Sequence, residues 1–263
     1  MENAPSVRAL QQYAATTGNL TARIALHRYG TNPQGWYSWL HERLPLDGDV
    51  LEVGAGTGKL WSHAGPREIR LTLTDFSPAM CEQLRSVPGA VVHRCDATSL
   101  PFAAGSYDGV IANHMLYHLD DPDAGLREFA RVLRPGGRVA VAVNGRGHLA
   151  ELTSIGAAVG RPDLRLSASC NDITAETAPD LMGRHFVEIA VERYHGDLEV
   201  PAVEPILEYL ASLSEDPLTP GQQRAVRELV QSRIDTDGMY RIRKDTVLIT
   251  ARTDLSPAVA AQA

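Results

Sequence analysis

The sequence predicts an α/β fold: a doubly wound, mostly parallel sheet with helices on both of its faces. Three observations lead to this prediction. An apolar strand, Val50–Val53, runs directly into the glycine-rich turn Gly54–Gly58, and a second short strand ends on the acid Asp75. Strand-like and helical segments then alternate as far as Asn144, which is typical of parallel sheets covered on both sides. Ligands of such sheets lie beyond the carboxyl ends of the strands.

The turn Gly54–Gly58 has glycine at every second position, so its backbone can approach a ligand closely. A phosphate-binding P-loop does not fit, because Val53 and Leu60 stand where it requires glycine and Ser or Thr. A dinucleotide-binding turn does not fit either, since Lys59 occupies the position of its third glycine. The pattern G-x-G-x-G after the acid Glu52 fits the turn of enzymes that use S-adenosylmethionine (SAM).

The remaining elements of the predicted core follow in order. Asp75 ends its strand about 20 residues after the turn, where an acid accepts hydrogen bonds from ribose hydroxyls. Asp96 follows a third strand, and Asn113 ends a fourth. The run Arg134–Gly137 breaks a helix before a fifth strand. We expect a helix from Lys59 onward and strands over 71–75, 91–94, 107–113 and 138–144.

Five segments of this core come in a defined order and spacing over roughly residues 48–147: LEVGAGTG (51–58), LTDFSPAM (73–80), DATSLPF (96–102), SYDGVIANHMLYHLDD (106–121) and VLRPGGRVAV (132–141). Together they resemble the class I SAM-dependent methyltransferases, most closely the small-molecule type that includes the ubiquinone/menaquinone methyltransferases. The resemblance implies a Rossmann-like sheet of seven strands, with the last strand inserted antiparallel beside the fifth. It also implies SAM as cofactor and S-adenosylhomocysteine as product. It says almost nothing about the substrate.

The segments outside this core are expected to shape the substrate side. The leader has helical spacing over 6–15, 21–27 and 36–44, and its aromatic residues Tyr13, Tyr29 and Trp36 either pack on the sheet or line a substrate chamber. The resemblance favours a helical cap. After the fifth strand we expect helices over 149–159, 172–182, 203–213 and 219–234, a sixth strand over 185–193 and a last strand within 240–252.

The chain is accordingly divided into a helical cap or lid (1–46), a SAM-binding core (47–147), a substrate-side insertion that also completes the sheet (148–254) and a flexible tail (255–263). The stretch 145–185 is expected to form the second wall of the substrate pocket.

Several residues of the core are candidates for the cofactor site, each with a structural alternative. Glu52 compensates the cofactor's amino group or caps its strand, and Asp75 binds the ribose or caps the next helix. Asp96 takes the adenine amino group or forms a turn, whereas Phe76 and Met80 flank the adenine or belong to the core. The predicted cofactor-binding residues are Glu52, Gly54, Ala55, Gly56, Gly58, Asp75, Phe76, Met80, Asp96, Ala97 and Asn113.

Methyl transfer depends mainly on positioning the acceptor, and a base is needed only when the acceptor is protonated. His114 is the first candidate for that base and His118 the second; alternatively His118 packs beside or caps the next helix. The two lie four residues apart without a third ligand at a recognisable spacing, so no metal site is expected. The predicted substrate-binding residues are Tyr13, Tyr29, Trp36, His114, Arg146 and His148. Arg146 and His148 are proposed to receive an acidic group of the substrate.

Composition limits the other classes of function. The net charge of −7 argues against nucleic acid as a partner. Three irregularly spaced cysteines, Cys81, Cys95 and Cys170, fit a reducing compartment. No apolar run reaches membrane-spanning length and the N-terminus lacks a signal core, so we expect a cytoplasmic protein without membrane contact.

The sequence therefore predicts a SAM-dependent methyltransferase acting on an O, N or C atom of a small molecule, with natural-product biosynthesis as the expected context. The alternatives are methylation of a peptide or carboxylate, and a SAM-binding module without catalysis. An exchanged leader is compatible with a homo-oligomer.

Overall fold

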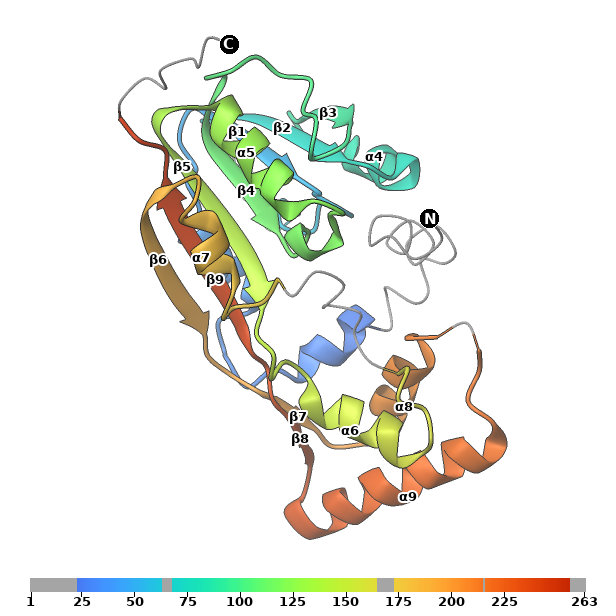
Figure 1. Ribbon diagram of the computed structural model, residues 1–263. Helices are drawn as coiled ribbons and strands as arrows, with labels where there is room; N and C mark the ends of the chain where they lie inside the picture. The colour runs from blue at the N-terminus through green and yellow to red at the C-terminus, as the bar shows by residue number, and fades with distance from the viewer. Residues whose placement is uncertain (1–22, 63–67, 165–172, 215, 256–263) are drawn as a thin grey trace.

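The computed structural model describes residues 23–62, 68–164, 173–214 and 216–255, and its centre is one large sheet (Figure 1). The antiparallel strand β9 lies between β5 and β6, while β1 to β5 are mutually parallel. The doubly wound sheet and its inserted last strand, both predicted, are confirmed. In spatial order the strands are β3 (Val91–Arg94), β2 (Arg70–Asp75), β1 (Asp49–Val53), β4 (Tyr107–Asn113), β5 (Leu133–Asn144), β9 (Thr246–Arg252) and β6 (Val187–Tyr194).

Alternate residues of the central strands contribute to two hydrophobic layers, one on each face of the sheet. On β4, Val110 and Ala112 belong to one layer and Ile111 to the other, as the two-residue period of a strand requires. The helices α5 (Pro122–Val132) and α7 (Ala178–Met182) cover the first face. The second face is covered by α3 (Trp36–His41) and α4 (Pro78–Leu84). Helices on both faces are the predicted arrangement.

Helix boundaries follow local capping signals. Asp121 caps α5 by accepting the Ala124 N–H at 2.9 Å, with Pro122 at the first helical position. A reciprocal pair of bonds between Thr219 and Gln222 caps the long helix α9 (Pro220–Asp237). The remaining helices are η1 (His27–Tyr29), η2 (Leu116–His118), α6 (Ala150–Ala158) and α8 (Glu204–Ala211).

Two expected helices differ from prediction. The helix expected from Lys59 is not formed in the described residues, because the chain runs through turns as far as Ser62. The helix expected over 172–182 is shorter: α7 begins at Ala178. Before it, the Thr177 hydroxyl accepts the Thr174 N–H at 3.0 Å, so this side chain holds the backbone in a turn.

A second hydrophobic core lies below the main sheet in Figure 1. It is built from α6, α8, α9 and a small antiparallel sheet of β7 (Leu198–Val200) and β8 (Tyr240–Ile242), which the sequence analysis did not foresee. Leu26 and Tyr29 of the leader pack into it. The leader is thereby anchored to the C-terminal part of the chain. Among the described residues no helix has both the length and the apolar character required to cross a bilayer.

Candidate active site

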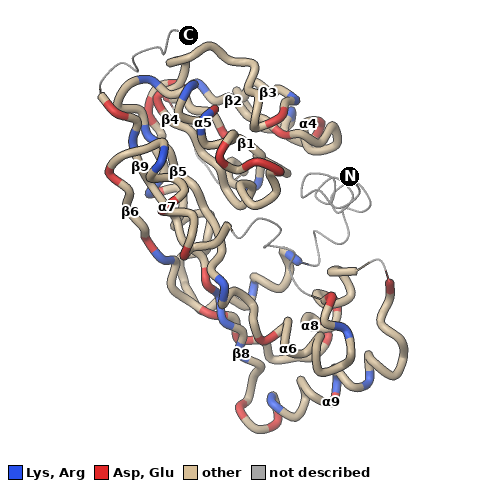
Figure 2. Tube along the Cα trace, in the orientation of Figure 1, with Lys and Arg blue, Asp and Glu red and all other residues tan. Residues whose placement is uncertain are grey.

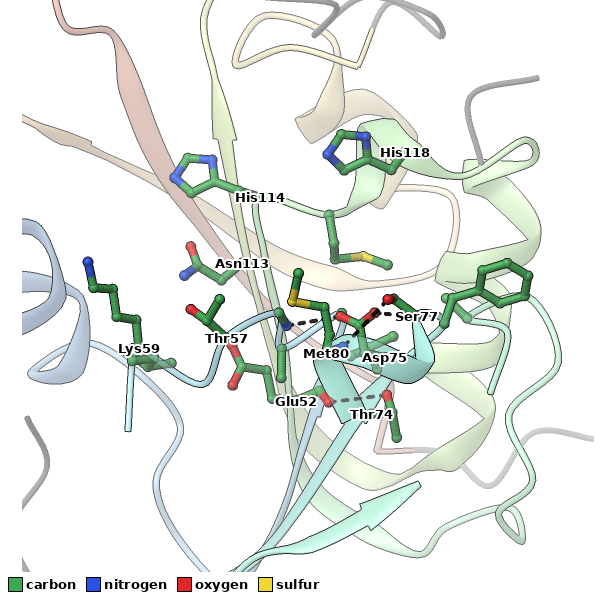
Figure 3. A pocket seen from close by; sticks show the side chains of 18 of the residues that line it. Glu52, Thr57, Lys59, Thr74, Asp75, Ser77, Met80, Asn113, His114 and His118 are labelled. Atoms are coloured by element: carbon green, nitrogen blue, oxygen red, sulfur yellow. Dashed lines mark hydrogen bonds between the residues drawn. The ribbon is translucent and has the colours of Figure 1, made fainter. Parts of the chain in front are cut away.

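The carboxyl ends of β1, β2 and β4 surround a cavity of about 320 Å³, a volume typical of small-molecule sites. It lies where the strand order reverses between β1 and β4, the place at which doubly wound sheets bind ligands. Figure 3 shows side chains from the turn after β1, the end of β2 and the loop after β4 arranged around this space. The predicted residues that line it are Glu52, Gly54, Ala55, Gly56, Asp75, Phe76, Met80, Asp96, Ala97, Asn113, His114 and His118.

Glycine is needed at the three positions of the turn for different physical reasons. Gly56 has φ +57°, and a Cβ added there would meet no atom within 4 Å, so its open side faces the cavity. A Cβ at Gly54 would lie 2.7 Å from the Cβ of Met115, and one at Gly58 would lie 2.9 Å from Val87. Gly54 and Gly58 thus permit close packing, while Gly56 keeps room for a ligand against the backbone. Gly58 does not line the cavity.

Asp75 is held rigidly at the end of β2. Its Oδ2 accepts the N–H of Gly56 at 2.9 Å and its Oδ1 accepts the N–H of Ser77 at 2.8 Å. Burial raises the pKa of the Asp75 carboxyl, although these hydrogen bonds oppose the shift. The hydroxyl that caps α4 belongs to Ser77, which accepts the Met80 N–H at 3.5 Å. Asp75 is therefore not the helix cap, and each of its oxygens keeps a further lone pair for a ligand.

Glu52 is the buried acid of the cavity, with 2% of its surface exposed. Its Oε2 accepts a hydrogen bond from Nε1 of Trp61, as a carboxylate inside an apolar strand requires. Tyr37 of α3 lines the same cavity, and its pKa is raised by burial and then by the charge of Glu52. Tyr37 and Lys59 are among the cavity residues that were not predicted; the signal for Tyr37 was the aromatic content of the leader.

The residues expected around the adenine also line the cavity. Met80 is 4% exposed and Phe76 is 42% exposed, so Phe76 has room to move over a ligand. Asp96 forms a turn, since its Oδ1 accepts both the N–H and the hydroxyl of Thr98 at 2.8 Å. The turn role was the alternative considered for Asp96, and it coexists with a position on the cavity wall.

His114 and Asn113 bring unpaired polar atoms to the end of β4. His114 adopts φ +56°, a conformation uncommon outside glycine. Nδ1 of His114 and Oδ1 of Asn113 are buried without a hydrogen-bond partner in the described residues. Such atoms cost about 1–3 kcal/mol each, which a ligand offering a partner would relieve.

Both candidate bases are neutral near pH 7. Burial, followed by the charges of His27 and Lys244 among its neighbours, lowers the pKa of His114 to about 3. Burial also lowers the pKa of His118 to about 4. Either imidazole can accept a hydrogen bond, but with such pKa values both are weak proton acceptors.

The predicted substrate-side residues are dispersed. Trp36 lies behind His114, with the centres of the two rings 5.4 Å apart. His148 stacks on His27, which in turn is a neighbour of His114. Tyr29 packs into the second core, and Arg146 is exposed, with its backbone N–H directed to Glu176. None of these four lines the cavity. Tyr13 lies outside the described residues.

The glycine turn, the strand-end acids and the inserted antiparallel strand are together typical of the SAM-binding core of class I methyltransferases. Residues 51–141 match the methyltransferase domain family. In the described part of the chain no group of three or more His, Cys, Asp or Glu is arranged to hold a metal ion.

Characterised relatives support the same assignment. The chain is 37% identical over 101 residues to an O-methyltransferase of Aspergillus sclerotiorum, covering 35% of this chain and 38% of that protein. It is 40% identical over 94 residues to a demethylmenaquinone methyltransferase of Beutenbergia cavernae, covering 35% and 39%. The matches thus span about two fifths of these relatives. A SAM-dependent methyltransferase of Thermotoga maritima, described as a possible histamine N-methyltransferase, shares the fold with TM-score 0.58 at 18% identity over 93% of this chain and all of that one.

Proposed function

We propose that this protein transfers the methyl group of SAM to a small-molecule acceptor. The observation that carries the proposal is the cavity itself: Gly56 leaves it open beside the fixed carboxylate of Asp75 and the buried Glu52, and it ends at the unpaired atoms of Asn113 and His114. One end is therefore suited to a nucleoside with a cationic amino group, and the other has polar atoms available to an acceptor.

Each group has a defined task in this proposal. Asp75 binds the ribose hydroxyls, Glu52 compensates the amino group, and Phe76 and Met80 enclose the adenine. SAM supplies the methyl group and its own leaving group. The chain's residues position the acceptor at Asn113 and exclude water, which is the main requirement of such a displacement.

We also propose a source for the acceptor, a compartment for the reaction and a lid for the site. The acceptor is a product of specialised metabolism, the reaction takes place in the cytoplasm, and residues 1–46, of which the structure describes 23–46, act as the lid over the site. Figure 2 supports a small molecule rather than nucleic acid, because basic and acidic residues are interspersed along the coloured part of the chain. A continuous basic face is the usual feature of nucleic-acid binding.

Calorimetric titration with S-adenosylhomocysteine tests the cofactor site. We expect Asp75→Ala to weaken binding at least about tenfold, the loss expected for hydrogen bonds to a charged group. Asp121→Ala is the matched control, since it removes another carboxylate that accepts a backbone N–H but lies outside the cavity. Equal affinities of Asp75→Ala and wild type would contradict the assigned site.

Turnover is tested with methyl-labelled SAM and a panel of phenols, carboxylic acids, amines and a peptide mixture. Label in a small molecule supports the proposal. Label only in peptides, or cofactor binding with no transfer to any acceptor, would favour the corresponding alternative: a peptide methyltransferase or a SAM-binding module.

A further inference from the structure

A group of polar side chains lies behind His114, away from the cofactor cavity. Trp36 contacts His114 and also Tyr194, with ring centres 5.4 and 5.3 Å apart. Nζ of Lys244 lies 4.6 Å from the centre of the Tyr194 ring. These residues come from the leader, the end of β4, the end of β6 and the β8–β9 connection. His114 thus separates the cofactor cavity from a second polar region.

Two imidazoles extend this region. His27 of η1 stacks on His148, with ring centres 6.4 Å apart, and Nδ1 of His148 accepts the backbone N–H of Asp245 at 3.1 Å. Nδ1 of His148 therefore carries no proton in the neutral ring, so Nε2 carries it and is a donor. Nδ1 of His27 and Nδ1 of His114 are buried without a hydrogen-bond partner in the described residues.

Two donors of this region lack an acceptor in the described residues. Nε1 of Trp36, which can only donate, is buried with no hydrogen-bond partner in the described residues. The ammonium of Lys244 has no carboxylate within ion-pair distance in the same part of the chain. Nearby acids are already engaged: Asp245 pairs with Arg193, and Oδ1 of Asp197 accepts the backbone N–H of Lys244.

Lys244 is unusual in this chain. The sequence contains only two lysines, Lys59 and Lys244, among 25 basic residues; the first lines the cofactor cavity and the second lies in this region. Burial lowers the pKa of Lys244 to about 8, so it is largely charged at pH 7. Its charge lowers the pKa of His27, His114 and His148, after burial in each case. An anion would compensate this partly buried cation.

We propose that the methyl acceptor carries an anionic oxygen, a carboxylate or a phenolate, which binds to the ammonium of Lys244 with the N–H groups of Trp36 and His148. This inference rests on the proposed methyltransferase function. It keeps the acidic group expected from the sequence but replaces Arg146 with Lys244 as its cationic partner. His114, which contacts Trp36 on one side and lines the cofactor cavity on the other, then marks the boundary at which acceptor and cofactor meet.

The test compares ligands that differ in one charge. Protein saturated with S-adenosylhomocysteine is titrated with benzoate, with 4-nitrophenolate and with benzamide, which is close to benzoate in shape but neutral. We expect benzoate or 4-nitrophenolate to bind at least about tenfold more tightly than benzamide, and the preferred anion identifies carboxylate or phenolate. Equal binding of all three, or binding of none, would overturn the proposal.

Variants then assign the cation. Lys244→Met should abolish the preference for the anion. Trp36→Phe should reduce this preference, because it removes the N–H donor but keeps an aromatic side chain. Arg243→Met is the matched control, since Arg243 is the adjacent, exposed cation and should leave the preference intact. An unchanged preference in Lys244→Met would contradict the assignment. Affinity for S-adenosylhomocysteine is measured on every variant. If the wild type does not bind S-adenosylhomocysteine, the proposed function is rejected separately. Titration with benzoate in the absence of S-adenosylhomocysteine then still tests the role of Lys244.

Discussion

At the scale of single residues, a substitution at Gly56 can separate the effect of backbone strain on stability from the effect of a side chain on ligand binding. Gly56 has φ +57° and Gly105 has φ +64°, and a Cβ at either would meet no atom within 4 Å. Alanine at each position should therefore cost a similar amount of stability, about 1–2 kcal/mol. Only Gly56→Ala should also weaken binding of S-adenosylhomocysteine, because only Gly56 lines the cavity. Calorimetry with urea unfolding checks both; equal affinities in the two variants would place the ligand elsewhere.

The lowered pKa values of His114 and His118 lead to a second prediction at this scale. Both rings are already neutral well above their pKa values of about 3 and about 4. With an acceptor identified by the transfer assay, kcat should thus show no step between about pH 5.5 and 7.5, where an ordinary imidazole titrates. A step near the usual imidazole pKa that disappears in His114→Gln would contradict this prediction and identify His114 as a base.

At the scale of elements, the leader is held by the segment that follows β6. The N–H of Thr31 donates to the Asp197 carbonyl at 2.9 Å, and Nδ2 of Asn32 donates to the His195 carbonyl at 2.7 Å. Gly196 has φ +123°, and a Cβ there would lie 2.9 Å from the backbone nitrogen of Asn32. Gly196→Ala should therefore displace residues 31–35, the loop that precedes α3 and places Trp36 beside His114.

Hydrogen exchange tests this role of the loop. In Gly196→Ala the amides of residues 30–40 should exchange faster and anion binding should weaken, with affinity for S-adenosylhomocysteine retained. Gly160→Ala is the control, since Gly160 has φ +74° but open space around it. Unchanged exchange at residues 30–40 would show that the leader is positioned by other contacts.

At the scale of the whole molecule, the partly buried histidines make stability depend on pH. Burial lowers the pKa of His27 and His118 to about 4 and of His114 to about 3, and that of His148 well below its usual value. The unfolded chain therefore binds more protons below about pH 6.5, and stability falls as the pH decreases from there. Thermal unfolding between pH 7.5 and 5 should show this fall.

The fall should be smaller in His114→Gln than in the control His195→Gln, whose side chain is exposed. Equal slopes would mean that His114 takes up its proton in the folded state. The hydrogen bond from Arg70 lowers the pKa of the Asp49 carboxyl to about 2. Asp49 therefore loses its stabilising contribution only at lower pH, below the ordinary pKa of an aspartate.

Much of the fold and of the cofactor site could be predicted from the sequence because both depend on local patterns. The glycine turn 54–58 needs particular backbone angles, and Asp75 stands at a fixed distance after it. In the apolar strands, the two-residue period determines which side chains face each side of the sheet. The turns at Lys59–Ser62 and the late start of α7 show the limit of such patterns. Before α7, the hydrogen bond between the Thr174 N–H and the Thr177 hydroxyl holds a turn where helical spacing predicted a helix.

The sequence by itself determined the class of fold, the cofactor turn and the strand ends at which a ligand binds, because each is encoded within a few neighbouring residues. Only the tertiary structure decided which side chains gather around His114. Trp36, His148 and Lys244 approach it from distant segments, and no spacing along the chain encodes that convergence. It depends on the leader packing into the second core and on the last strand entering the sheet beside β5, which together bring the β8–β9 connection to the end of β4.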